Sequence, residues 1–100
     1  MEDYLGLIRR LAEAFGKGGV DYAFAGALAA SLYGLPRTTT DVDLLIHVSS
    51  RAAKSRLVSD LERAGLRVDA GEIDRAFSSG YRVATFADRK TAYSVDVIFL

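Results

Sequence analysis

The eight residues from Asp41 to Val48, DVDLLIHV, constrain the fold more than any other stretch of this 100-residue chain. Their β-branched and aliphatic side chains are typical of a central strand. The segment that follows, RAAKSRLVSDLERAG, has the spacing of an amphipathic helix, as have the first residues of the chain. An apolar strand among helical segments predicts an α/β domain whose sheet is covered by helices.

The remaining elements are predicted from their periodicity and end signals. Helices are expected at the start of the chain, in ALAASLYG before Gly34 and Pro36, and from a Ser49 or Ser50 cap to Gly65. Strands are expected at Val20–Ala25, in DVDLLIHV, and in YRVATF and AYSVDVIFL, which resemble a hairpin. The pattern of LRVDAGEIDRAFSSG predicts neither a helix nor a strand. We therefore expect residues 1–100 to form a single α/β (α+β) domain, with a mixed sheet of about four to five strands and helices mainly on one face.

Composition excludes several classes of function. Thirteen basic residues balance thirteen acidic ones, so any contact with nucleic acid must be local and not driven by net charge. The absence of cysteine excludes disulfides, thiol nucleophiles and thiolate zinc sites. No apolar run approaches the roughly 20 residues of a membrane span, so we expect no membrane association and a cytoplasmic location.

Three aspartates occupy unusual positions. Asp41 and Asp43 lie on the same side of the expected strand, about 6.6 Å apart, because side chains alternate every ~3.3 Å. Two carboxylates at ~4 Å would repel by about 4 kcal/mol at an effective dielectric of 20. Asp96 lies within another apolar strand, VDVIF. If the two strands are neighbours, the three carboxylates converge and could hold two Mg²⁺ ions, the arrangement used for in-line phosphoryl displacement.

A phosphate-binding turn would complete such a site. Gly26 lies at an expected strand-to-helix junction, where the following backbone N–H groups, including that of Ala27, could contact phosphate oxygens. Arg37 precedes the aspartates by four residues and could pair with a phosphate or brace Asp41. By itself, a strand–glycine–helix pattern occurs in most α/β proteins.

These residues together resemble a known family. GALAASLYGLPRTTTDVDLLI followed by VDVIF is similar to the DNA polymerase β-like nucleotidyltransferases, and most to their toxin-type (abortive-infection and toxin–antitoxin) and minimal members. The resemblance covers about residues 20–100. It implies Asp41, Asp43 and Asp96 as catalytic metal ligands for two Mg²⁺ ions, and Gly26, Ala27 and Arg37 as contacts to the nucleotide.

The implied reaction is transfer of a nucleoside monophosphate from ATP or another NTP to a hydroxyl of RNA (tRNA) or protein. A cognate partner protein or a homo-oligomer is also expected. Two features depart from the family pattern: Ala27 stands where many members have serine or glycine, and family members are usually longer, with carboxy-terminal helices. An alternative is therefore a weak or inactive module that acts as a partner-binding antitoxin or regulatory subunit.

Each residue also has a structural interpretation. Asp41 could cap the preceding loop, Asp96 could pair across the hairpin with Arg82 or a loop lysine, and His47 could be a hydrogen-bonded strand-end residue. Basic residues in the helical segments are expected to be solvated, and the remaining acids to lie on helix surfaces or in loops; these are Arg9, Arg10, Arg51, Lys54 and Arg56, and Asp60, Glu62, Asp69, Glu72, Asp74 and Asp88.

Overall fold

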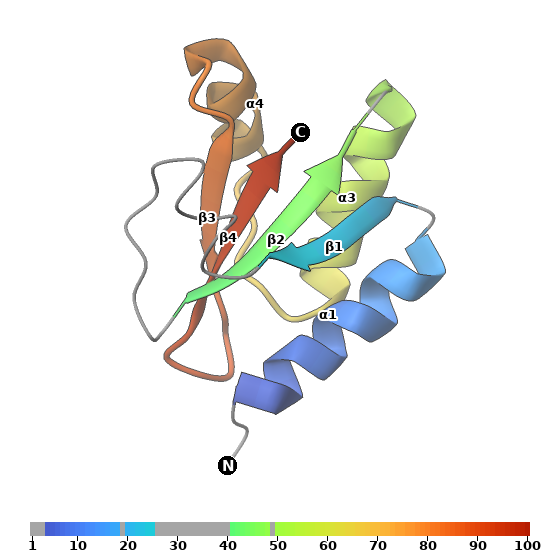
Figure 1. Cartoon of the computed structure of the whole chain (residues 1–100), viewed down its shortest axis with the longest axis vertical. Coiled ribbons are helices and arrows are strands. Elements are labelled where there is room, and N and C mark those ends of the chain that lie inside the picture. Colours follow the sequence, from blue (N-terminus) through green and yellow to red (C-terminus); the bar gives the residue numbers. More distant parts are fainter. Residues whose placement is uncertain (1–3, 19, 26–40, 49) are drawn as a thin grey trace.

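The computed structural model describes residues 4–18, 20–25, 41–48 and 50–100. Within them the chain forms three helices and four strands (Figure 1). Their order is α1 (Tyr4–Gly18), β1 (Asp21–Ala25), β2 (Asp41–His47), α3 (Arg51–Arg63), α4 (Ala70–Ser79), β3 (Val83–Ala87) and β4 (Ser94–Phe99). The helix expected in ALAASLYG lies outside the described residues.

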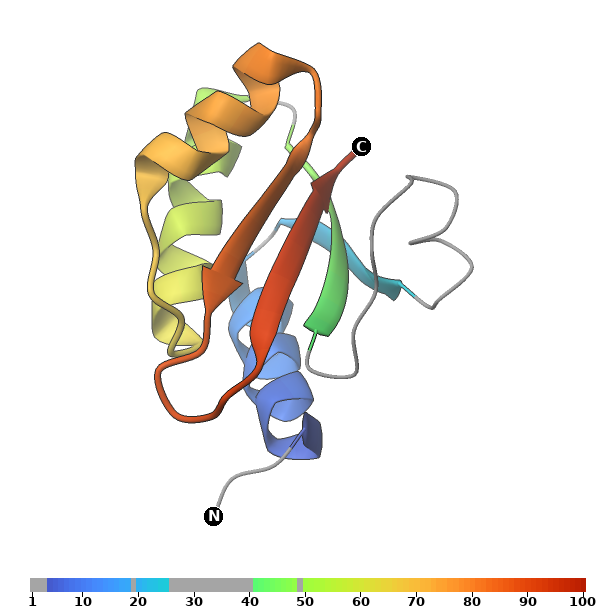
Figure 2. The same cartoon turned by 90° about the vertical axis from the view of Figure 1, so that its left-hand side faces the viewer.

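The four strands form one mixed sheet in the order β1-β2-β4-β3. β2 and β4 are parallel neighbours at its centre, and the two outer pairs are antiparallel. The helices cover one face of the sheet (Figure 2). The predicted mixed α/β fold and the β3–β4 hairpin are thus confirmed.

Local signals explain the boundaries of the two later helices. Ser50 caps α3 by accepting a hydrogen bond from the Ala53 amide, and Gly65 follows the helix with a φ of 98°. α4, which was not predicted, begins at Asp69, whose carboxylate accepts from the Gly71 amide, and ends at left-handed Gly80. Its apolar residues Ile73 and Ala76 face the core.

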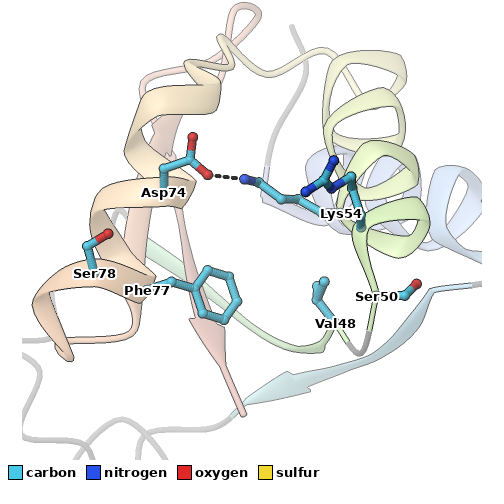
Figure 3. A pocket seen from close by; sticks show the side chains of 7 residues that line it. Val48, Ser50, Lys54, Asp74, Phe77 and Ser78 are labelled. Atoms are coloured by element: carbon cyan, nitrogen blue, oxygen red, sulfur yellow. Dashed lines mark hydrogen bonds and ion pairs between the residues drawn. The ribbon is translucent and has the colours of Figure 1, made fainter.

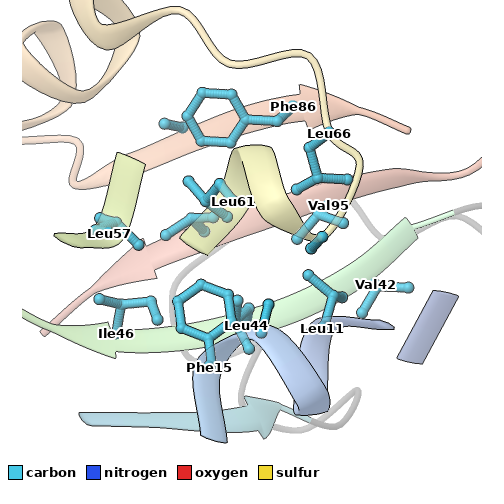
Figure 4. Packing of buried hydrophobic residues seen from close by; sticks show 14 of the residues in the cluster. Leu11, Phe15, Val42, Leu44, Ile46, Leu57, Leu61, Leu66, Phe86 and Val95 are labelled. Carbon is cyan, nitrogen blue, oxygen red and sulfur yellow. The ribbon is translucent and has the colours of Figure 1, made fainter. Parts of the chain in front are cut away.

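The core lies between the sheet and the helices (Figure 4). Alternate residues of β2 and β4 enter it, so the remaining residues of these strands lie on the opposite face. The contributions come from every helix and from three strands: Leu7, Leu11 and Phe15 of α1, Val42, Leu44 and Ile46 of β2, Leu57 and Leu61 of α3, Ile73 and Ala76 of α4, Ala84 and Phe86 of β3, and Val95, Val97 and Phe99 of β4.

A buried ion pair fastens α1 to the turn between β3 and β4. Arg10 donates two hydrogen bonds to Asp88, at 3.0 and 2.8 Å, and a third to the carbonyl oxygen of Ala64. Its side chain is 16% exposed and that of Asp88 is fully buried. The expectation that Arg10 is solvated is therefore wrong; Asp88 lies in a loop as expected, but its carboxylate is buried and has a structural role.

Candidate functional site

Two of the predicted acids are direct neighbours across the centre of the sheet. Asp43 of β2 pairs in register with Asp96 of β4, and Asp96 pairs in register with Thr85 of β3. Leu44 and Val95, next to the two acids in sequence, point into the core. Side-chain alternation therefore places Asp43, Asp96 and Thr85 in one row on the face of the sheet that α1, α3 and α4 do not cover.

The two carboxylates are close and largely shielded from solvent. Neighbouring strands lie about 4.8 Å apart, and paired residues point to the same side. Asp43 is 3% exposed and Asp96 is 9% exposed. The Thr85 hydroxyl donates a 2.7 Å hydrogen bond to one carboxylate oxygen of Asp96 and so fixes its orientation. Neighbouring carboxylates supply the hard oxygen ligands that a divalent cation such as Mg²⁺ takes.

The other predicted site residues are described only in part or not at all. Asp41 is the first residue of β2 and pairs in register with Ser94, but its side chain lies outside the described part of the structure. Gly26, Ala27 and Arg37 lie outside the described residues altogether. Among the side chains that are described, no group of three or more His, Cys, Asp or Glu is placed to hold a metal ion.

Two structural alternatives are resolved by the contacts. Arg82 does not pair with Asp96; it donates to the carbonyl oxygens of Phe99 and Leu100 and lies over the Phe77 ring. His47 is half exposed and lies 3.8 Å from the carboxylate of Asp21 at the far end of β2. His47 lies four positions along the strand from Asp43, about 13 Å away, so it is not part of the acidic row.

Thr85 is the one residue of this row that the sequence analysis missed. It lies in YRVATF, which was predicted as a strand, and the hairpin with β4 was predicted as well. Placing the turn at residues 88–93, where the Asp88 amide donates to the Tyr93 carbonyl oxygen, pairs Thr85 with Asp96. The register of the hairpin was therefore the signal in the sequence that could have identified Thr85 as the neighbour of Asp96.

A separate hollow of about 530 Å³ lies between α3 and α4, beyond the end of β2 (Figure 3). Phe77 and Val48 contribute apolar side chains, and Lys54 forms an ion pair with Asp74 across the gap. Arg51 and Ser50, at the start of α3, also line it. Neither Asp43 nor Asp96 reaches this hollow, so it is not part of the carboxylate site.

Comparison with known proteins adds no relative: no family model, no curated protein and no solved structure matches this chain. Among the described residues, no helix has both the length and the apolar character needed to cross a membrane.

Proposed function

We propose that the chain is a Mg²⁺-dependent nucleotidyltransferase that uses Asp43 and Asp96, together with Asp41, as its metal ligands. The observation that carries this proposal is the registered pairing of Asp43 with Asp96 on the face of the sheet that α1, α3 and α4 do not cover. The resemblance of GALAASLYGLPRTTTDVDLLI and VDVIF to nucleotidyltransferases assigns the same residues independently of the structure.

The reaction would join the acceptor hydroxyl oxygen to the α-phosphorus of an NTP. The bond from that phosphorus to pyrophosphate breaks, and the hydroxyl proton is lost to water. When bound, Mg²⁺ would supply charge neutralisation and orientation of the reacting oxygens. Asp43 and Asp96 would hold the cation, and Thr85, which donates to Asp96, would keep that carboxylate in its orientation. Gly26, Ala27 and Arg37 would hold the triphosphate.

The acceptor would be a hydroxyl of RNA or of a protein in the cytoplasm, and the enzyme would act as the toxin-like part of a two-component system. Catalysis of this kind depends mainly on positioning and on neutralising charge.

A second candidate is a catalytically weak or inactive module that has the nucleotidyltransferase fold and acts by binding a partner protein. One observation favours it. Asp43 and Asp96 are only 3% and 9% exposed, so a metal–triphosphate complex reaches them only if neighbouring groups move.

Calorimetry of NTP binding, with Mg²⁺ and with EDTA, tests the proposal and separates the two candidates. The native chain is compared with Asp43→Asn and with Asp21→Asn, a matched change at an exposed aspartate of the adjacent strand. The proposal predicts Mg²⁺-dependent binding that Asp43→Asn abolishes and Asp21→Asn retains. Release of pyrophosphate on adding RNA or protein acceptors supports the enzyme; binding without turnover supports the module. Absence of NTP binding by the folded native chain contradicts both.

A further inference from the structure

The two edge strands of the sheet differ in what lies beside them. β3 is covered at its Ala87 end by the segment that precedes α4: the Arg67 amide donates to the Ala87 carbonyl oxygen at 2.9 Å, and Leu66 forms a bridge with Asp88. β1 pairs with β2 on one side, and no described strand pairs with its other side. The outward N–H and C=O groups of β1 are therefore placed to pair with a further strand.

β1 also lacks the features that normally protect an edge strand from pairing, which are lysine, proline or a bulge. Its sequence, DYAFA, has neither lysine nor proline, and all five residues pair with β2 in an unbroken register. Its one charged residue, Asp21, stands at the start of the strand. Phe24 pairs in register with the core residue Leu44 and so points to the helix side, yet it is 38% exposed. The edge of β1 thus presents an exposed aromatic side chain beside its free backbone groups.

The neighbouring flank of α1 is apolar as well. Arg10 lies on the flank that faces α3, since it donates to the carbonyl oxygen of Ala64, the C-cap of that helix. Helical spacing places Leu5, Ile8 and Ala12 on the opposite flank. Leu5 is 66% exposed, and Ile8 is only partly buried against the core. We use the name β1 edge strip for the apolar residues of this flank and of β1: Leu5, Ile8, Ala12, Tyr22 and Phe24.

The edge of β1 is complementary to a second copy of itself. If two copies of β1 pair antiparallel about a two-fold axis at Ala23, all five residues of each strand are paired, and no other antiparallel register achieves this. In this register Tyr22 of each copy lies opposite Phe24 of the other, which gives two aromatic cross-strand pairs. Asp21 lies opposite Ala25, so no like charges face each other. An interface that repeats the same contacts on both sides of the axis is that of a two-fold dimer.

The charges at the ends of the strip agree with this arrangement. α1 and β1 run in opposite directions (Figure 1), and the rings of Phe15 and Tyr22 lie 5.4 Å apart near the end of the helix and the start of the strand. Arg9 therefore lies toward the Ala25 end of β1. The two-fold axis brings Asp21 of the second copy to that same end, so each end of the interface carries one positive and one negative charge.

We propose that the β1 edge strip is a dimer interface, at which a second copy of this chain pairs through β1 and joins the two four-stranded sheets into one continuous sheet. Residues that lie opposite each other in an antiparallel pair point to the same side, so the helices of both copies cover one face. The two acidic rows, each with Asp43 and Asp96, stay on the other face. This inference goes beyond nucleotidyl transfer, since the dimer would form whether or not the carboxylates are active.

The interface is tested by light scattering of the eluting protein over a range of concentrations, with two matched double variants. Leu5→Lys/Phe24→Lys places charges in the strip, and Tyr81→Lys/Leu100→Lys changes two equally exposed apolar residues elsewhere. We expect the native chain and the second variant to reach twice the mass of one chain, and the first variant to dissociate at least about tenfold more readily. A native chain that stays monomeric up to millimolar concentration, or equal dissociation of the two variants, would overturn the proposal.

The register is tested by cross-linking, for which the chain is suited because it contains no cysteine. Residues directly opposite in an antiparallel pair have Cβ atoms about 4.5 to 5.5 Å apart, close to the separation in a disulfide. Ala23→Cys is therefore expected to form covalent dimers on mild oxidation. Ala87→Cys, at an exposed alanine of the other edge strand, is the control and is expected to stay largely monomeric. Equal yields in the two variants would overturn the register. Both measurements are made in EDTA without nucleotide, so neither result bears on NTP binding.

Discussion

Asp43 and Asp96 are paired in register on the two parallel strands at the centre of the sheet, and Thr85 extends the same row by one strand. The carboxylates thus come from segments far apart in sequence and depend on strand pairing for their spacing. A metal site of this kind is sensitive to the groups that hold its ligands in place.

Replacing Thr85 with valine tests that dependence. The substitution removes the 2.7 Å hydrogen bond to Asp96 but preserves the β-branched shape. If the carboxylates bind metal as proposed, divalent-ion affinity should fall about 10- to 100-fold, the usual effect of losing an outer-shell partner. Titration with Mn²⁺ followed by EPR measures this. Thr85→Ser should restore binding; equal affinity in the valine variant and the native chain would show that Thr85 does not orient a ligand.

Disrupting the buried pair of Arg10 and Asp88 should destabilise the fold severely. Asp88→Asn removes the negative charge that accepts two hydrogen bonds from the Arg10 guanidinium, and breaking a buried ion pair in this way typically costs about 3 to 5 kcal/mol of the free energy of unfolding. Urea denaturation measures the loss. A double-mutant cycle with Arg10→Met separates the pairing from the other contacts of Arg10, and a coupling energy near zero would contradict the assigned role.

The same pair should make stability depend on acid pH. Burial alone would raise the pKa of Asp88, but the hydrogen bonds from Arg10 and Thr91 outweigh it, and the pKa lies below its ordinary value. The stabilisation is therefore complete above the unfolded-state pKa of about 3.9 and is lost as pH falls from there through the folded-state pKa. Urea midpoints at a series of pH values between neutral and acid should converge for the native chain and Asp88→Asn at the acid end. A constant difference would be inconsistent with this linkage.

Asp60 should show the opposite dependence. Its pKa is raised by burial, so its charged form destabilises the fold once pH exceeds the folded-state pKa. Asp60→Asn should be more stable than the native chain at neutral pH, because the neutral amide removes the buried charge. The difference should shrink as pH falls toward the unfolded-state value. A less stable variant at pH 7 would mean that the contact with Arg63 outweighs desolvation.

Gly65 and Gly80 form a matched pair for testing the space around Arg10. Both have positive φ, 98° and 76°, so alanine at either position should cost about 1 kcal/mol for the backbone conformation. A Cβ at Gly65 would lie 2.7 Å from Arg10 Nη1, whereas nothing lies within 4 Å at Gly80. Thermal unfolding should show Gly65→Ala to be the less stable variant by at least about another 1 kcal/mol. Equal melting temperatures would mean that Arg10 moves aside without loss.

The sequence was sufficient to predict the strands that carry Asp43 and Asp96, because both strands are apolar runs with clear end signals. It did not determine that they are neighbours, since strand order depends on how the connecting helices pack. α4 was missed because Gly71 and two serines weaken its helical pattern, although Asp69 and Gly80 mark its ends. The phosphate-contacting residues Gly26, Ala27 and Arg37 stay predictions.

The main errors among the sequence-based expectations concern charged residues that the structure buries. Asp60 occupies an apolar position of α3, between Leu57 and Leu61 in the buried stripe, which was a usable signal. Arg10 and Asp88 gave no such signal, because an ion pair between distant segments cannot be recognised from either residue alone. The expectation that charged residues are solvated holds for most positions and fails where two charges are buried together.

The strand order has a consequence for how the molecule assembles. β4 lies between β2 and β3, although it follows both in the chain. The β1–β2 part and the α4–β3 part therefore cannot join into one sheet until β4 has been inserted between them. Such long-range closure slows folding, and a partly folded chain would carry two unsatisfied strand edges, with Asp43 on β2 but without Asp96 beside it.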